Sequence, residues 1–173
     1  MGDDRGMTIV DVLTGFAESG GIGVLKPGAS LADVSERLGP PQDGEYFPGR
    51  RRKRGEPRNV RYGDVRLEVC CDSVLSVALS TGAGSVDLPS GARGGTEKLR
   101  SAVTAAQLRD AFATAGIRAE EGLWPEPADQ FTLVVPHSPA DVHFTFRRTG
   151  ADGSGDSGTV LHSAIARNHH ACG

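Results

Sequence analysis

The chain has 173 residues, of which 38% are hydrophobic and 24% are charged, a balance typical of a folded globular protein rather than a disordered one. A net charge of −3 and an isoelectric point near 5.9 argue against general binding to nucleic acid or anionic membranes, because both need a basic surface. The 24 glycines predict many turns, and the 5% aromatic content predicts a core of aliphatic side chains.

The beginning of the sequence, MGDDRGMTIV, lacks the basic and apolar regions of a signal peptide. No apolar run approaches the roughly 18 residues that a membrane span needs. The three cysteines, two of them adjacent, do not form the pattern of a disulfide framework. We therefore expect a cytoplasmic protein without membrane contact, and the Ala-, Gly-, Arg- and Asp-rich usage is typical of a bacterium with a GC-rich genome.

The first 25 residues predict an N-terminal helix. Apolar residues recur there at helical spacing, and the run ends at a pair of glycines: Ile9, Val12, Leu13, Phe16 and Gly20-Gly21. A second helix is expected from Leu31 to Leu38, because Ser30 is a natural N-cap and the Gly-Pro-Pro sequence at 39–41 ends it.

Two strands are predicted between residues 65 and 80. Apolar and polar residues alternate in VRLEVCC, which indicates a strand with one buried face. A turn at 72–73 leads to a second strand, so that the two form a hairpin, and residues 59–62 add a third strand. Strict alternation places Cys71 in the core and Cys70 outside, and it gives the second strand a shared face of Leu75, Val77 and Leu79.

The Gly-rich residues 81–95 predict a linker, after which the pattern recurs. Thr104 and Gln107 match a capping box at the start of a helix that ends at Gly116. Alternating segments follow at 130–135, 141–146 and 159–166, and the last of them has Leu161, Ser163 and Ile165 on one face. Residues 167–173 are expected to form a flexible tail.

The two predicted hairpins align in sequence. Residues 64–69 match 141–146, residues 73–80 match 159–166, and each pair of strands follows a capped helix. We interpret the chain as an α+β fold of two related helix-plus-antiparallel-strand units, at 26–80 and 96–166, with the helices packed on one sheet face. The alternative is that any two half-buried hairpins share this alternation.

The segment LKPGASLADVSERLGPP resembles the helix-opening motif of the β-lactamase-inhibitor-like and outer-membrane-assembly lipoprotein superfamily. The matching positions are Gly28, Ser30, Val34, Leu38, Gly39 and Pro41. The resemblance implies an antiparallel sheet after the helix and, for a tandem pair of units, a concave sheet face that grips a partner protein. Those proteins are exported, whereas we expect no export signal, lipid-attachment cysteine or paired cysteines here, so the resemblance supports the fold more than the function.

No catalytic constellation is evident in the sequence. GDSG at 155–158 matches the nucleophile turn of trypsin-like proteases, but no upstream segment supplies the His base and buried Asp that this chemistry needs. His162, His169, His170 and Cys172 carry metal-ligand chemistry, yet three of them follow the last predicted strand, where no scaffold fixes a tetrahedral site. We therefore predict no catalytic residue, no metal site and no cofactor.

Two local features are candidates for contact with a partner. Five consecutive cations at 50–54 form either a solvated loop or a site for an anionic partner, and an acidic protein surface fits better than nucleic acid, which recruits more aromatic side chains. Trp124 lies in an acidic, Pro-bounded segment and is either satellite core or an interface anchor. The predicted partner-binding residues are Arg50, Arg51, Arg52, Lys53, Arg54 and Trp124.

Three hypotheses on function follow. The first is a non-enzymatic binding protein, of the inhibitor or toxin-immunity kind, that engages a protein partner through a sheet face and loops. The second is an enzyme or accessory subunit whose site is dispersed in sequence, with these candidate residues: Glu68, His137, Asp141 and His143. The third is nucleic-acid binding through residues 50–54. The sequence predicts neither the partner nor the oligomeric state.

Overall fold

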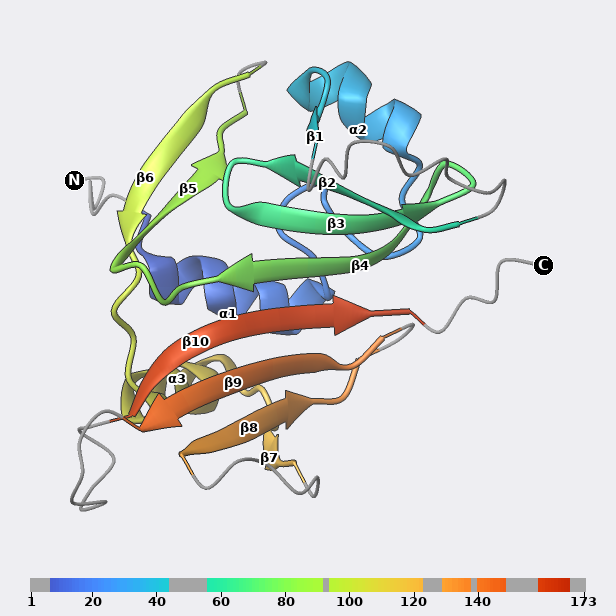
Figure 1. Cartoon of the computed structure of the whole chain (residues 1–173). Coiled ribbons are helices and arrows are strands. Elements are labelled where there is room, and N and C mark those ends of the chain that lie inside the picture. The colour runs from blue at the N-terminus through green and yellow to red at the C-terminus, as the bar shows by residue number, and fades with distance from the viewer. Residues whose placement is uncertain are drawn as a thin grey trace.

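A computed structural model describes residues 7–43, 56–91, 94–122, 129–137, 140–148 and 159–168 (Figure 1). The helices in these ranges are α1 (Ile9–Ser19), α2 (Leu31–Leu38) and α3 (Ala105–Ala115). The strands are β1 (Gln42–Asp43), β2 (Arg58–Tyr62), β3 (Val65–Cys70), β4 (Ser73–Ser80), β5 (Ser85–Pro89), β6 (Thr96–Arg100), β7 (Glu120–Glu121), β8 (Gln130–Val135), β9 (Val142–Arg148) and β10 (Thr159–Arg167).

Eight of the strands form one sheet in the order β1-β2-β3-β4-β10-β9-β8-β7, and every neighbouring pair is antiparallel. The expected α+β class with a large antiparallel sheet is therefore confirmed. The two predicted hairpins meet at the centre of the sheet, where β4 pairs with β10. β5 and β6 form a separate two-stranded hairpin.

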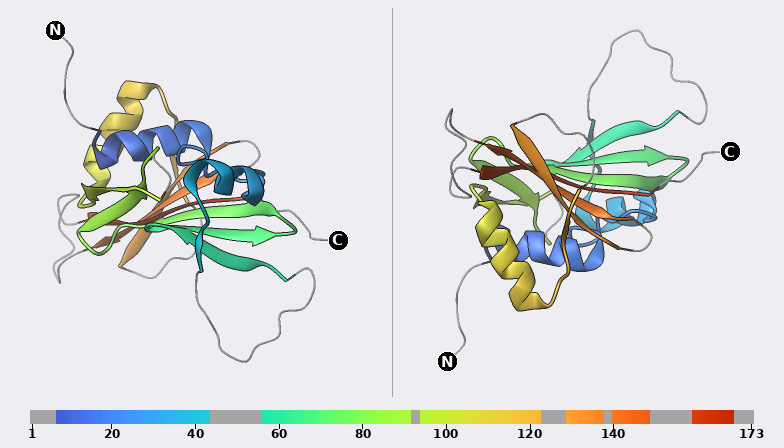
Figure 2. Two further views of the ribbon diagram at one scale, coloured as in Figure 1. Left: turned by 90° about the horizontal axis from the view of Figure 1, so that it is seen from above. Right: turned by 90° about the horizontal axis from the view of Figure 1, so that it is seen from below.

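The three helices lie on one face of the eight-stranded sheet (Figure 2). The core fills the space between them, because one set of alternate strand residues is buried together with the apolar stripes of α1, α2 and α3. We call the opposite face, over which no helix of the described ranges lies, the outer face.

The three predicted helices and the predicted N-caps of α2 and α3 are confirmed, and α1 adds a capping box that was not expected from the sequence. α1 and α3 each begin with a capping box, Thr8 with Asp11 and Thr104 with Gln107, and each ends at a glycine in the left-handed region, where a residue without a Cβ is favoured. α2 begins at Ser30, whose side chain accepts a hydrogen bond from the backbone N–H of Asp33.

Phe144 of β9 joins the two longer helices to the sheet. Its ring lies 6.2 Å from that of Phe16 on α1 and 5.2 Å from that of Phe112 on α3, both in edge-to-face geometry. All three rings are fully buried or nearly so. In a chain with few aromatic residues, this cluster connects two helices to the sheet through one buried side chain.

A β-bulge in β4 overturns the face predicted for that strand. Val69 pairs with Val74 and Glu68 pairs with Ser76, so Leu75 is an extra residue that inverts the alternation. The core therefore takes up Val74, and then Val77 and Leu79, while Leu75 is buried outside the core cluster.

β10 contains a second bulge with the same effect. Phe146 pairs with Leu161 and Thr145 pairs with Ser163, which leaves His162 as the extra residue. The shared face predicted for Leu161, Ser163 and Ile165 is therefore wrong. The core residues of this strand are Leu161, Ala164 and Ala166.

The cysteine assignment is also reversed. Cys70 ends β3 and is only 2% exposed, whereas Cys71 is exposed. Cys71 and Asp72 both have positive φ, as a two-residue hairpin turn requires, so the turn begins one residue earlier than predicted. The Asp72 carboxylate accepts hydrogen bonds from the Ser30 hydroxyl at 2.7 Å and from the Ala32 backbone N–H at 3.2 Å, which fixes the start of α2 against the hairpin.

The segment predicted as a Gly-rich linker contains β5. Val86 and Leu88 belong to the core, while the glycines lie outside the strand. The β5–β6 hairpin approaches the β2–β3 turn closely, because the Asp64 N–H donates to the Asp87 carbonyl oxygen at 2.7 Å. The many glycines of this segment favoured the prediction of a linker, although Val86 and Leu88 alternate with polar residues as in a strand with one buried face.

Candidate functional site: the outer face of the sheet

The pairing registers place side chains on the outer face in rows that run across the strands. One row passes through the middle of the sheet, with one residue from each of six strands, and we call it the central row. It consists of Arg61, Arg66, Ala78, Ile165, His143 and Val134.

Two further rows flank the central row. The ion-pair row crosses β2, β3, β4 and β10 and consists of Asn59, Glu68, Ser76 and Arg167. The hydroxyl row crosses β4, β10, β9 and β8 and consists of Ser80, Ser163, Thr145 and Thr132. Every residue of these two rows is polar, as expected for a sheet face that is not covered by helices.

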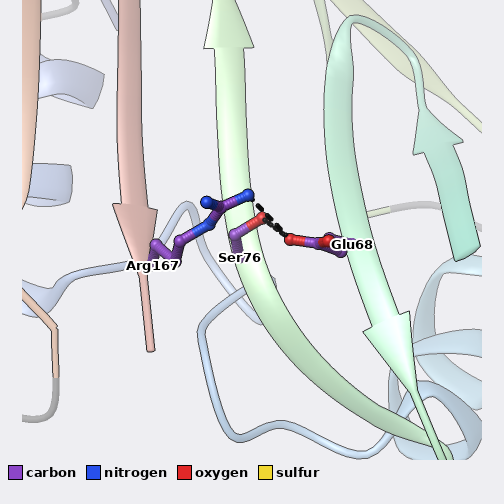
Figure 3. Close-up of polar contacts among 3 residues, drawn as sticks. All are labelled: Glu68, Ser76 and Arg167. Atoms are coloured by element: carbon purple, nitrogen blue, oxygen red, sulfur yellow. Dashed lines mark hydrogen bonds and ion pairs between the residues drawn. The ribbon is translucent and has the colours of Figure 1, made fainter. Parts of the chain in front are cut away.

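The ion-pair row is internally bonded (Figure 3). The Arg167 Nη2 of β10 lies 3.0 Å from the Glu68 Oε2 of β3. The same oxygen accepts a hydrogen bond at 3.4 Å from the Ser76 hydroxyl of the intervening strand β4. Three neighbouring strands are thereby linked across the centre of the sheet, and the only acidic side chain of these rows is engaged.

The hydroxyl row carries no charge. The hydroxyl oxygens of Thr132 and Thr145 lie 3.1 Å apart, within hydrogen-bond distance. Ser80 is exposed, and Ser163 and Thr145 are partly exposed. Hydroxyl groups that both donate and accept hydrogen bonds are suited to a protein surface in contact with this face.

Arg61 and Arg66 form the basic end of the central row. They lie directly opposite each other on β2 and β3, and both are exposed. Neither makes a side-chain hydrogen bond or ion pair within the described residues. The alternation of the strands could have placed both on the outer face, but only the pairing register brings them together.

The four residues of the dispersed-site hypothesis do not converge. His137 lies on the helix side, where its Nε2 is 2.8 Å from the Glu18 carbonyl oxygen, and its backbone N–H donates to Asp141 at 3.1 Å. His143 and Glu68 project from the outer face, but β4 and β10 separate their strands, a spacing of about 14 Å at the usual distance between strands. These groups therefore cannot act on one substrate atom as a unit.

The His137 Nε2 must carry the proton, because a carbonyl oxygen only accepts hydrogen bonds. Its Nδ1 is buried and has no hydrogen-bond partner among the residues that the structure describes. The ring packs against Gly20, where a Cβ would come within 3.0 Å of Nδ1. His137 thus connects the β8–β9 turn to the end of α1, which is a structural position.

The predicted partner-binding residues, Arg50, Arg51, Arg52, Lys53, Arg54 and Trp124, lie outside the described residues. The same holds for GDSG at 155–158 and for three members of the metal-ligand set: His169, His170 and Cys172. The remaining member, His162, is the bulge residue of β10. Within the described ranges, no three His, Cys, Asp or Glu side chains gather as metal ligands.

No family model, curated protein or solved structure matches the chain. No helix among the described residues is long and apolar enough to cross a bilayer. The candidate site is the outer face, on which the ion-pair row, the hydroxyl row and the Arg61–Arg66 pair lie side by side.

Proposed function

We propose that this chain is a non-enzymatic protein-binding protein, of the inhibitor or toxin-immunity kind, that docks its partner on the outer face. One observation carries the proposal. The outer face extends over an eight-stranded sheet without a covering helix in the described ranges, and its rows consist mostly of small, hydroxyl-bearing, β-branched and basic side chains, with Asn59, Glu68 and His143 as the exceptions. A surface of this kind offers area and hydrogen-bonding groups to a second protein.

The arrangement of the side chains favours docking over reaction. Catalytic groups converge on one point, usually in a concave pocket. The rows of the outer face are instead spread along neighbouring strands at the strand spacing of about 4.8 Å. The Glu68 carboxylate, which could act as a base, is occupied by Arg167 and Ser76.

We also propose that the fold consists of two related units, with α1 rather than α2 as the helix of the first. α1 and α3 have the same length, a capping box at the N-terminus and a left-handed glycine at the C-terminus. The strands that follow pair in matching order, β1-β2-β3-β4 and β7-β8-β9-β10. In place of the units at 26–80 and 96–166 that the sequence suggested, the proposed units extend over 8–80 and 104–167, and α2 is an insertion in the first.

The registers support this relationship residue by residue. The pairing of Val69 with Val74 before the β4 bulge corresponds to that of Phe146 with Leu161 before the β10 bulge. The short edge strands match as well. Arg61 and Val134 are equivalent positions of the two units, and their partners on the edge strands are Gln42 and Glu120, respectively. A common ancestral unit accounts for two bulges at equivalent positions more simply than chance does.

Duplication has a functional consequence for this proposal. Joining β4 to β10 removes the edge that each four-stranded unit would expose there, and it doubles the width of the outer face. The tandem proteins that the α2 segment resembles are expected to grip a partner on such a face. The same use of the sheet is what we propose here.

The proposal is tested by capture from the native host with matched surface variants. Thr145→Arg puts a long charged side chain into the hydroxyl row, and Thr114→Arg makes the same change on the exposed surface of α3. We expect the wild type and the α3 variant to retain one stoichiometric protein that the Thr145 variant loses. Recovery of no such protein, or equal recovery by all three, contradicts the proposal.

The identity of the captured protein separates the two kinds of binding protein. An immunity protein is expected to be encoded beside its toxin, so the gene for the captured protein should neighbour the gene for this chain. Neutralisation of that protein's activity by stoichiometric addition of this chain then distinguishes an inhibitor from a passive scaffold.

A further inference from the structure

The outer face contains a pair of like charges that no side chain of the described residues is seen to neutralise. Arg61 and Arg66 are Cα partners on adjacent strands, so their Cβ atoms lie about 5 Å apart. Directly opposed like charges destabilise a sheet, and neighbouring acids usually compensate them. Both side chains are exposed.

The two acidic residues that flank Arg66 in the sequence are already engaged. Asp64, two residues before Arg66, accepts a hydrogen bond at 2.7 Å from the Asp87 backbone N–H of the β5–β6 hairpin. Glu68, two residues after Arg66, binds Arg167 and Ser76. The Cα partners on either side of the pair, Gln42 of β1 and Ala78 of β4, carry no charge.

We infer that the Arg61–Arg66 pair binds carboxylate groups of an acidic partner protein that docks on the outer face. This inference rests on the proposed function and names the chemistry of its partner. A guanidinium group presents a planar fork of N–H donors that matches a carboxylate in bidentate geometry, and two adjacent forks select a surface with closely spaced acids. The two positive charges then stabilise the complex instead of opposing each other.

The charge of the β2–β3 end of the face supports an acidic partner. The outer positions of the six longer strands carry one glutamate, Glu68, and four arginines: Arg61, Arg66, Arg147 and Arg167. Two further carboxylates belong to the opposite end of the sheet, namely Glu120, the Cα partner of Val134, and Asp129, which lies 3.8 Å from the Arg147 guanidinium, so the excess of positive charge is concentrated at Arg61 and Arg66. The complete chain, in contrast, has a net charge of −3. A basic face on an acidic protein orients an acidic partner toward that face during encounter.

The rest of the central row favours a protein over a nucleic acid. Beyond Ala78, it continues with the β-branched residues Ile165 and Val134, both partly exposed, on either side of His143. No aromatic side chain occupies an outer position of the described strands, so stacking platforms for bases are missing from this part of the face. Apolar and hydroxyl contacts beside a basic pair fit a protein surface with an acidic edge.

The test measures binding of the full chain to fluorescein-labelled poly-L-glutamate, with residues 50–54 replaced by glutamine so that this cationic run does not dominate. In this background, Arg61→Gln/Arg66→Gln is compared with Arg37→Gln/Arg100→Gln, which removes the same charge from exposed positions on α2 and β6. Arg61→Lys/Arg66→Lys keeps the charge but loses the forked donors. Thermal unfolding of each variant verifies that it is folded.

We expect the glutamine pair at 61 and 66 to raise the dissociation constant for poly-L-glutamate by about ten-fold or more, the lysine pair to have an intermediate effect, and the control to change it by less than about three-fold. Equal losses in both glutamine pairs, or no loss, overturn the inference. The inference is also overturned if an oligothymidylate of equal charge binds as tightly as poly-L-glutamate and if the glutamine pair at 61 and 66 abolishes that binding. Such a result assigns the arginine pair to nucleic acid.

The two proposals fail in distinguishable ways. Suppose that a host protein is captured through the hydroxyl row but that the substitutions at 61 and 66 leave poly-L-glutamate binding unchanged. The docking function then stands, and the inference that the partner is acidic is wrong. If poly-L-glutamate binding depends on the pair but no host protein is captured, the proposed function is the one that fails.

Discussion

Ala78 of β4 lies directly opposite Ile165 of β10 at the centre of the sheet. The two neighbouring pairs are Leu79 with Ala164 on one side and Val77 with Ala166 on the other. In each of these pairs β4 supplies the larger aliphatic residue and β10 supplies an alanine. When the two hairpins are matched through their bulges, the alignment of residues 73–80 with 159–166 that the sequence suggested shifts by one residue, and Ala78 becomes equivalent to Ile165. The centre of the proposed two-fold relationship therefore passes between these two residues.

This relationship predicts that the two central side chains can be exchanged. Ile165→Ala is expected to destabilise the protein by about 1 kcal/mol, because a partly buried β-branched side chain is lost from a strand. Adding Ala78→Ile should restore most of this loss, since the two positions have equivalent surroundings. Urea unfolding of the single and double variants measures both effects. A double variant no more stable than Ile165→Ala, or equal rescue by Ser80→Ile, contradicts the symmetric centre.

Phe144→Ala is expected to reduce the free energy of unfolding by about 3–5 kcal/mol, because Phe144 is fully buried and contacts the rings on both α1 and α3. Phe144→Leu should cost clearly less, since it leaves a smaller cavity. Chemical denaturation of the purified variants provides the measurement. A similar small loss for both variants would show that this ring does not join the helices to the sheet.

Gly63→Ala is expected to be among the most destabilising glycine substitutions. Gly63 has a φ of +61°, and a Cβ there would overlap the Asp87 carbonyl oxygen, a backbone atom of β5. Gly84→Ala is the matched control, because its φ of +81° is also left-handed but no atom lies within 4 Å of the added Cβ. The control should cost about 1–2 kcal/mol and Gly63→Ala clearly more. Equal thermal unfolding temperatures would contradict the close contact between the turn and β5.

The ion pair between Glu68 and Arg167 should make a small contribution to stability. Its side chains are 27% and 58% exposed, and exposed pairs typically contribute about 0.2–1 kcal/mol. A double-mutant cycle with Glu68→Gln and Arg167→Gln is expected to give a coupling energy in this range that decreases with added salt. A coupling energy of zero at low salt would contradict an energetic contribution of this ion pair to the connection between β3 and β10.

The capping box of α1 should make stability depend on pH. The hydroxyl and the backbone N–H of Thr8 both donate to the Asp11 carboxylate, at 2.7 and 2.8 Å, and they lower the pKa of Asp11 below its ordinary value of 3.8. Because the folded pKa is the lower one, the stabilisation is complete above the unfolded pKa and is lost as the pH falls through the folded pKa.

The stability difference between the wild type and Asp11→Asn should therefore be largest above about pH 5 and should shrink toward about pH 3. Gln107→Ala in the capping box of α3 is the control, since an amide does not titrate and its effect should not depend on pH. Denaturation curves at several pH values measure both differences. A constant difference for Asp11→Asn would show that its carboxylate is not bonded in this way.

The sequence by itself determined the elements whose signals are local. Capping residues indicated the starts of α2 and α3, the spacing of apolar residues located α1, terminal glycines indicated the ends of all three helices, and alternation located most strands of the large sheet. These signals survive without tertiary information because each depends on residues within about one turn or one strand of each other.

Only the tertiary structure decided which strand faces contribute to the core beyond the bulges and which hairpins meet. An extra residue such as Leu75 or His162 inverts the alternation, and it is visible only when the partner strand is present to set the register. The pairing of β4 with β10 joins segments separated by about half the chain, and this pairing is what brings Glu68 to Arg167. The register between distant strands depends on the packing energy of all side chains on both sheet faces. A pattern within one short segment does not contain this information.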